Sequence, residues 1–575
     1  MDMRQKIIYS TFLVAIFLME GLGFFNGREL ALIIILMMPF FIYFNTLIER
    51  KKIVVPEKMT ILFTAFLLFS AVSTLLAVNK QQSFEYFLYH TALFLIFVYT
   101  YNFKKELTKS VVNLIFLLSG IFLFYSIVIK FLPNLAFLIP SRGYQYVYPF
   151  YKTHNPLGEF LLIVLTMSLF FSLWRKIYLL LFFTFLPAFL FSYSRAAYLS
   201  LIVVIGLMAF YIIRTKSDKK LFYSFFPMGG VVIVSLLLFF GVVNYNRKIP
   251  VISHIREIMV SNYDLGEKTF FSWRDEYFKQ AGKAILEKPF FGFGPYNFIY
   301  ASIKHASIPR VLAETSDNIF LETIAENGIF AGMTFILIIV FWIKSGFGSL
   351  FNKKNLFSKG LFFVFLSMLV VFQVSSVQRF YSYLLLFYII AALIYEEEVR
   401  YHSARFFYLL QIVLFLVANL IVVSSILMKT GHYQQAFYLY PLNKKAYPVI
   451  IAANLFKQKT KADMYLKLYG EFFGGDPDIL LDIGKTYEGQ KEMGKAIIYY
   501  EKAYQANKFL DFNSAERIYN LKKKTEGVGR AKEFYADYLK NFVKAKSTYF
   551  ITFDEKKKML DFCWSIGDIL CPKTL

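Results

Sequence analysis

Thirteen long apolar stretches constrain the fold of this chain more than any other feature of its 575-residue sequence. A helix needs roughly 20 apolar residues to cross the hydrocarbon core of a bilayer. A content of 57% apolar and 20% aromatic residues is also unusual for a soluble globular protein. We therefore predict an all-α polytopic membrane protein with about 13 transmembrane helices, in a range of about 12 to 14. The predicted spans are 7–25, 30–48, 59–78, 84–101, 110–130, 157–174, 177–193, 196–213, 222–243, 318–343, 358–376, 381–396 and 406–428.

The distribution of lysine and arginine orients these spans. If the N-terminus is cytoplasmic, most inside connections are short and basic, for example "NFKKELTK" and "RTKSDKK". Such an excess is typical of cytoplasmic loops in the cell (inner) membrane. With a cytoplasmic N-terminus, the segment 244–317 is a large extracytoplasmic loop. An odd number of spans then places the tail, 429–575, outside, whereas an even number would move the tail to the cytoplasm. The net charge of +24 reflects topology and anionic lipid, because no nucleic-acid motif is recognisable.

The tail predicts a soluble helical domain, separate from a transmembrane domain at 1–428. The stretch "ILLDIGKTYEGQKEMGKAIIYYEKAYQANK" has the two-helix pattern of a tetratricopeptide (TPR) repeat. A generic helical hairpin domain is the alternative. Repeat arrays of this kind bind partners or brace a neighbouring domain. The residues that fit the pattern are Leu480, Ile483, Gly484, Tyr487, Ala496, Tyr500 and Ala503.

The only two cysteines, Cys563 and Cys571, lie near the end of the tail. Two thiols do not make a metal site alone. If the tail lies outside the cell they can form one disulfide, and two unpaired thiols are the alternative.

Two arginines fall on the predicted outer side. Arg195, in "FSYSRAAYLSL", lies in a very short turn between two spans. Arginine at the rim of a bilayer is costly and marks a functional site, although a headgroup anchor is the bland alternative. Arg274 begins an amphipathic stretch in the large loop, where pairing with Asp275 or Glu276 is its bland alternative.

Acidic residues lie where this loop leads into the next predicted span. Asp317 and Asn318 precede the apolar run, and an Asp there is also an ordinary helix N-cap. Glu322 and Glu326, four residues apart, share one helical face, which we expect to face the arginines or a wet cavity. For Glu326 the alternative is a buried acid that is hydrogen-bonded to the preceding loop or paired with an arginine.

Three further residues complete the candidate site. Gly292 and Gly294, in "KPFFGFGPYNF", let the backbone bend sharply or approach a ligand closely. His154 precedes a span near the outer face. His305 is a weaker candidate, because an exposed loop histidine explains it as well. Together the charged groups suit an anionic, lipid-anchored substrate, since guanidinium groups bind phosphate oxygens and stay charged.

Taken in order, "YKTHNPLGEFLL", "SRAAYLS", "WRDEYF", "KPFFGFGPYNF" and "SDNIFLETIAENGIFAG" resemble the O-antigen ligase and O-antigen polymerase superfamily of bacterial membrane glycosyltransferases. The resemblance covers about residues 140 to 343. It implies a GT-C-type bundle and a polyprenyl-diphosphate-linked glycan donor. It also implies that Arg195 and Arg274 hold the diphosphate as it leaves. Ligases of this family have a histidine, the presumed base, where this chain has Asp317, which favours a polymerase or a ligase with another acceptor.

The sequence thus predicts a glycosyltransferase that needs no metal and no cofactor and inverts the anomeric centre. Asp317, Arg274 and Arg195 would be catalytic. The substrate-binding set would be Arg195, Arg274, Asn318, Glu326, His154, Gly292 and Gly294. The acceptor hydroxyl, on lipid, protein or glycan, stays open, as does the choice between ligase and polymerase. A transporter of polyprenyl-linked glycans and a scaffold that acts through its tail are the alternatives, and a protein partner of the tail is expected by analogy alone.

Overall fold

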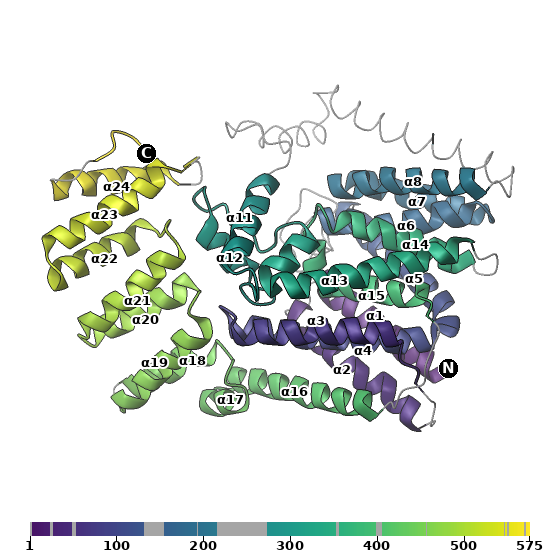
Figure 1. Ribbon diagram of the computed structural model, residues 1–575, viewed down its shortest axis with the longest axis horizontal. Coiled ribbons are helices and arrows are strands. Elements are labelled where there is room, and N and C mark those ends of the chain that lie inside the picture. The colour runs from purple at the N-terminus through teal and green to yellow at the C-terminus, as the bar shows by residue number, and fades with distance from the viewer. Residues whose placement is uncertain are drawn as a thin grey trace.

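The protein is described by a computed structural model that covers residues 3–22, 27–48, 53–131, 154–192, 194–215, 230, 273–351, 356–397, 405–455, 457–545, 547–548, 551–567 and 571–575. These residues form 22 α-helices and contain no strand (Figure 1). The all-α prediction is confirmed for this part of the chain.

Long, roughly parallel helices form a bundle that holds the N-terminal part of the chain (Figure 1). Its members are α1 (Met3–Leu22), α2 (Gly27–Ile48), α3 (Glu57–Leu75), α4 (Lys80–Asn102), α5 (Lys104–Phe131), α6 (His154–Ser172), α7 (Ile177–Phe191), α8 (Arg195–Thr215), α13 (Ile319–Phe351), α14 (Leu356–Val371), α15 (Tyr381–Ile394) and α16 (Arg405–Lys429).

Twelve of the predicted spans coincide with these helices, and the predicted span 222–243 lies outside the described residues except for Gly230. Seven helices in the described part are long and apolar enough to cross a membrane, which supports a multi-pass membrane protein. They are α2, α3, α5, α6, α8, α13 and α16. Helices α7, α14 and α15 are apolar but shorter, and the count of thirteen stays a prediction.

Aromatic side chains fill the interior of the bundle. Trp342 is completely buried, and the ring centroids of Tyr388 and Phe97 lie 5.3 and 5.6 Å from its own. Buried tyrosines need a partner for the hydroxyl, because water is absent there. The Tyr43 hydroxyl donates to the Leu95 carbonyl at 2.8 Å, and the Tyr89 hydroxyl donates to the Tyr381 carbonyl at 2.7 Å. The abundance of Phe and Tyr in the sequence therefore serves packing.

One end of the bundle carries two short helices, α11 (Arg274–Glu287) and α12 (Phe298–His305), and the 3₁₀ turn η2 (Val377–Arg379) (Figure 1). Backbone and side-chain hydrogen bonds tie several helices together here. Glu20, near the end of α1, accepts from the Tyr381 and Ser382 amides at the start of α15, at 2.9 and 2.7 Å. The Ile319 amide, at the start of α13, donates to the Phe372 carbonyl after α14 at 2.9 Å. We call this end of the bundle the site end.

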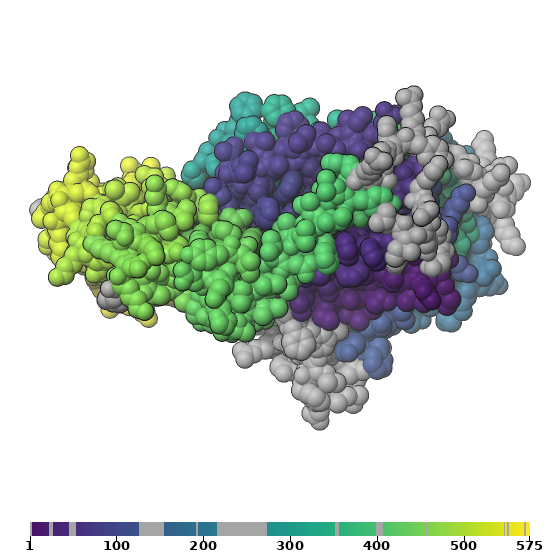
Figure 2. Space-filling view, turned by 90° about the horizontal axis from the view of Figure 1, so that it is seen from below, coloured from purple at the N-terminus to yellow at the C-terminus, as the bar shows by residue number. Residues whose placement is uncertain are grey.

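The tail forms helices with a hydrophobic core of their own. In Figure 2 it extends away from the bundle as a green-to-yellow arm. Gly484 packs against Tyr500, and a Cβ at Gly484 would lie 2.6 Å from the Tyr500 ring, so the close helix approach expected there is present. Cys563 and Cys571 form a disulfide. The helices are α17 (Tyr433–Leu439), α18 (Ala446–Leu455), α19 (Lys459–Phe473), α20 (Pro477–Gly489), α21 (Met493–Ala506), α22 (Phe512–Thr525), α23 (Val528–Val543) and α24 (Phe553–Ile566).

The tail rests on the site end through polar contacts. Asp476, the N-cap of α20, accepts from the Tyr300 hydroxyl of α12 at 3.5 Å, and within the tail it pairs with Lys444 at 2.8 Å. Arg310 pairs with Glu555 of α24 at 2.8 Å. The tail and the site end therefore lie on the same side of the bundle, and Figure 1 shows the N-terminus at the opposite end.

Cysteine labelling tests this orientation. We expect Lys523→Cys, exposed on α22, to react with a membrane-impermeant maleimide on intact spheroplasts. Lys105→Cys, exposed on α5 in a basic connection, should react only after permeabilisation, because basic loops stay cytoplasmic. The unchanged protein, with its cysteines paired, is the unlabelled control. Equal labelling of Lys105→Cys on intact spheroplasts would reverse or abolish the assignment.

Candidate active site

An ion pair between Arg274 and Asp317 lies at the centre of the candidate site. Arg274 Nε is 3.1 Å from Asp317 Oδ2, and the two side chains are only 19% and 13% exposed. Arg274 is the first residue of α11, and Asp317 lies just before α13. The structure thus joins two of the three residues that the sequence predicts as catalytic.

The alternative in which Arg274 pairs with its neighbour Asp275 or Glu276 is wrong. Asp275 pairs with Lys279 at 3.5 Å instead. Glu276 is buried and accepts hydrogen bonds from the Ser307 amide and hydroxyl, at 3.1 and 2.5 Å. Both acids next to Arg274 are therefore engaged elsewhere, and its guanidinium is directed to the acid across the loop.

Asn318, and not Asp317, is the N-cap of α13. The Asn318 side-chain oxygen accepts from the Phe320 and Leu321 amides at 3.1 and 3.0 Å, as a capping residue does. Its amide nitrogen donates to Gln373 Oε1 at 3.0 Å. Asp317 has a φ of 56°, a left-handed conformation that Asp tolerates better than most residues. This backbone conformation lets the Asp317 carboxylate pair with Arg274 while Asn318 completes the helix end.

The electrostatics of Asp317 suit proton transfer. Burial raises the pKa of the Asp317 carboxyl to about 6, and the Arg274 guanidinium beside it limits the rise. The group is therefore mostly ionised at neutral pH, with a proton affinity close to the pH at which it would work. That match is what a general base requires.

A third acid, Glu159 of α6, connects this pair to the turn that carries Arg195. Glu159 is 2% exposed, accepts from the Ser375 hydroxyl at 2.5 Å, and interacts electrostatically with Asp317 and Arg274 and with Ser194. Arg195, exposed, follows directly as the first residue of α8. Arg195, Arg274 and Asp317 thus belong to the same end of the bundle.

Close packing at Gly158 fixes this arrangement. A Cβ at Gly158 would lie 2.2 Å from the Ser192 hydroxyl oxygen and 2.7 Å from Ser194 Cβ, so only glycine lets α6 approach the turn between α7 and α8. His154 begins α6, and its side chain lies outside the described part of the structure. Its predicted role stays a prediction.

Glu322 and Glu326 pair with an arginine that the sequence reading did not single out. Arg379 Nε is 2.7 Å from Glu322 Oε1, and Arg379 Nη2 is 2.6 Å from Glu326 Oε1, with all three side chains buried. The guanidinium carbon also lies 4.2 Å from the centroid of the Tyr296 ring. The two acids share one face, as expected, but that face meets Arg379 of η2 and not Arg195 or Arg274. The sequence does contain a signal that could have identified Arg379, because it is a lone arginine between two apolar spans, in "SSVQR".

The loop from Pro289 to Asn297 packs against α13. The Gly294 amide donates to the Glu326 carbonyl at 2.8 Å, and the Tyr296 amide donates to Glu326 Oε2 at 2.9 Å. Gly292 has a φ of 64°, and a Cβ there would lie 2.3 Å from the Glu326 carbonyl oxygen. The close approach that Gly292 and Gly294 allow is to the protein's own backbone and side chains, so these contacts account for both glycines without a ligand.

His305 lies away from Asp317. It ends α12, and its Nε2 is 2.9 Å from a Glu287 carboxylate oxygen, while burial lowers its pKa. Within the described residues, no group of three or more His, Cys, Asp or Glu side chains is placed to hold a metal ion.

Arg379→Met tests the buried cluster. Removal of the cation leaves Glu322 and Glu326 buried without a counter-charge, which costs about 3–5 kcal/mol. We expect a marked fall in the melting temperature of the detergent-purified protein, partly reversed when Glu322→Gln and Glu326→Gln are added. Arg28→Met is the control, because Arg28 stacks on Tyr296 and Tyr381 at 5.2 and 5.6 Å and donates to the Arg379 carbonyl, so its loss leaves both acids paired with Arg379. Equal melting temperatures of the two arginine variants would contradict the prediction.

Gly292→Ala tests the loop. The left-handed φ costs a non-glycine residue roughly 1–3 kcal/mol, and the added Cβ also meets the backbone of α13. We expect lower thermal stability of the purified protein. Gly282→Ala is the matched control, because Gly282 lies inside α11 with nothing within 4 Å of an added Cβ. A Gly292→Ala protein as stable as Gly282→Ala would show that the loop accommodates a side chain.

Part of the chain is similar to a known protein family. A family model described as O-antigen ligase matches residues 180–336. This segment contains Arg195, Arg274 and Asp317. No curated protein shows a significant match to the chain. The family match supports a glycan-transferring function of the ligase or polymerase type, with a lipid-linked glycan donor.

Proposed function

We propose that this protein transfers a glycan from a polyprenyl-diphosphate carrier to an acceptor hydroxyl on the extracytoplasmic face of the membrane. The observation that carries the proposal is the Arg274–Asp317 pair, in which a half-buried cation and a base meet at one end of the bundle. Both residues lie inside the segment that matches the O-antigen ligase family.

Asp317 acts as the general base. Its carboxylate takes the proton of the acceptor hydroxyl while the hydroxyl oxygen attacks the anomeric carbon of the donor sugar. The bond between that carbon and the diphosphate oxygen breaks, and polyprenyl diphosphate leaves with the electron pair. A single displacement of this kind inverts the configuration at the anomeric carbon. The raised pKa of Asp317, about 6, supports this role.

Arg274 stabilises the diphosphate as it leaves. Its contact with Asp317 uses Nε, and in the described residues no hydrogen bond engages its two terminal nitrogens. Those two nitrogens suit the paired oxygens of a phosphate. Arg195, exposed at the start of α8, supplies a second cation to the same end. Fixed positive charge at the leaving group lowers the energy of the transition state.

Asn318 and Glu326 keep this site in shape. Asn318 closes the start of α13, and Glu326 holds both Arg379 and the amides of Tyr296 and Phe298. We propose that they act on substrate through the position of Asp317. Their contacts are with the protein's own groups.

The extracytoplasmic orientation is supported by the tail. The tail rests on the site end, and its Cys563–Cys571 disulfide suits an oxidising compartment. We propose that 429–575 is a TPR-like domain that positions a glycan, lipid or protein acceptor above the site.

The transporter alternative fits less well. It predicts broken helices near the middle of the membrane. Helix α13 is interrupted at Gly328, but this break is near its start, and the Ile329 amide beyond it donates to the Pro289 carbonyl of the adjacent loop at 2.8 Å. The backbone at the break is therefore satisfied by the protein's own loop.

Asp317→Asn tests the proposed base. With no carboxylate to accept the proton, the rate of glycan transfer should fall by about 10²–10⁴-fold. The wild-type rate should rise with pH through about 6, because the ionised carboxylate is the active form. The measurement is consumption of a synthetic polyprenyl-diphosphate glycan by purified protein in nanodiscs, with envelope extract as acceptor.

Asp275→Asn is the matched control for charge, since Asp275 neighbours Arg274 but pairs with Lys279. It should transfer at a rate close to wild type. Wild-type transfer by Asp317→Asn would remove Asp317 from the mechanism.

In a strain that lacks the gene and carries these variants, loss of long chains identifies a polymerase, while intact chains left on the lipid carrier identify a ligase.

A further inference from the structure

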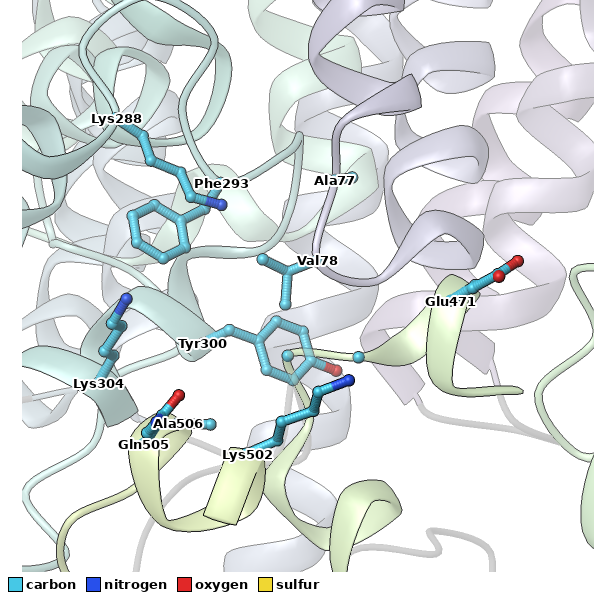
Figure 3. Close-up of a pocket in the computed structure, with 12 residues that line it drawn as sticks. Ala77, Val78, Lys288, Phe293, Tyr300, Lys304, Glu471, Lys502, Gln505 and Ala506 are labelled. Carbon is cyan, nitrogen blue, oxygen red and sulfur yellow. The ribbon is translucent and has the colours of Figure 1, made fainter. Parts of the chain in front are cut away.

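A cavity of about 370 Å³ lies between the site end and the tail. Its walls come from the turn between α3 and α4, from α12 and the loop before it, and from α19 and α21 of the tail. Its volume falls within the range of small-molecule binding sites. Figure 3 shows the side chains that border it, among them Lys288, Phe293, Tyr300, Lys304 and Lys502.

Three lysines from three elements give this cavity a positive charge. Lys288 caps the end of α11, Lys304 belongs to α12, and Lys502 belongs to α21. Lys304 pairs with Glu287 at 2.5 Å. In the described residues no ion pair engages Lys288 or Lys502. The lining acid, Glu471, is 53% exposed, and Figure 3 shows it pointing away from the lysines.

Of the three lysines, Lys288 is the one best suited to bind an anionic ligand. Its amino group lies 4.5 Å from the centroid of the Phe293 ring, and burial lowers its pKa. A partly buried ammonium group without an anionic partner in contact is unfavourable. Glu287 acts on Lys288 electrostatically but pairs with Lys304, so an anion in the cavity would give Lys288 a partner in contact.

The other lining groups suit a sugar. Among the side chains that line the cavity, Figure 3 shows the Tyr300 ring between Val78 and Lys502, and the Gln505 amide on the same side as Lys304. Aromatic rings stack on the C–H faces of sugars, and an amide side chain both donates to and accepts from hydroxyl groups. The apolar lining is limited to small groups and one ring, namely Ala77, Val78, Ala506 and Phe293, which is too little for an acyl chain.

We propose that this cavity binds an acidic oligosaccharide, through a carboxylate or phosphate held by Lys288 and Lys502 and a sugar ring held against Tyr300. The role of the cavity rests on the proposed function: the bound segment belongs to a glycan chain whose end lies at Arg274. Helix α11 connects the two places, with Arg274 at its start and Lys288 as its C-cap. Its 14 residues span about 20 Å, a length that a chain of several sugars covers.

Binding of a defined probe tests the cavity without the transfer reaction. The probe is tri-galacturonate, added to the full-length protein in neutral detergent and followed by microscale thermophoresis. We expect Lys288→Gln/Lys502→Gln to weaken binding by about tenfold or more, because it removes two charged contacts. If the double variant does not fold, Lys502→Gln alone tests the same prediction, because Lys502 lies on an exposed helix face. An increase in ionic strength from about 0.05 to 0.5 M should also weaken binding.

The matched control is Lys523→Gln, which removes an exposed lysine of α22 outside the cavity lining and should bind as wild type does. Arg274→Ala should keep probe binding and lose transfer, so failure of the cavity and failure of the proposed function give different results. Unchanged affinity in the lysine variants, or equal affinity for neutral maltotriose, would overturn the proposal. Lysine-dependent binding of phosphatidylglycerol vesicles without binding of tri-galacturonate would identify a lipid headgroup instead, and would also overturn it.

Discussion

The contact of Arg379 with Glu322 and Glu326 holds the site end together. Two carboxylates are buried near the rim of an apolar bundle, where an unpaired charge is strongly unfavourable. The arginine between them comes from η2, so α13 is joined to the connection between α14 and α15. Glu326 also accepts the amides of Tyr296 and Phe298, which fixes the loop after α11. Asp317 and Arg274 flank this cluster, and their separation depends on it.

Much of this arrangement follows from the sequence. Apolar period and length located twelve helices of the bundle, since a membrane leaves the backbone few alternatives. Arg274 and Asp317 were singled out individually by their positions, and their catalytic roles were taken from the family resemblance. Their direct contact could not be predicted, because a left-handed residue at Asp317 and a cap at Asn318 turn the acid toward α11. Arg379 was missed because it lies beyond the stretches, about residues 140 to 343, on which the family resemblance was based.

The tail adds a second layer to the same end. Asp476 joins it to Tyr300 of α12, and α12 follows the loop that Glu326 holds. A short path of contacts thus runs from the tail to the acids of α13. Sequence pattern indicated a helical tail and its tight helix pairs, such as Gly484 against Tyr500. It did not indicate where the tail would rest, because the contacts are single polar pairs between segments far apart in the chain.

The interruption at Gly328 divides α13 into a short first segment, the stub, and a long apolar segment. The stub before it, with Glu322 and Glu326, is fastened to η2 and the loop, while the long apolar part after it lies in the bundle. A transmembrane helix adjusts its tilt to the thickness of the surrounding bilayer. Because Gly328 has a φ of 84° and breaks the helical backbone, that tilt is not transmitted rigidly to the stub. The geometry around Asp317 therefore depends on the contacts that hold the stub to its neighbours, including α3 and the end of α14, more than on the tilt of the apolar part of α13.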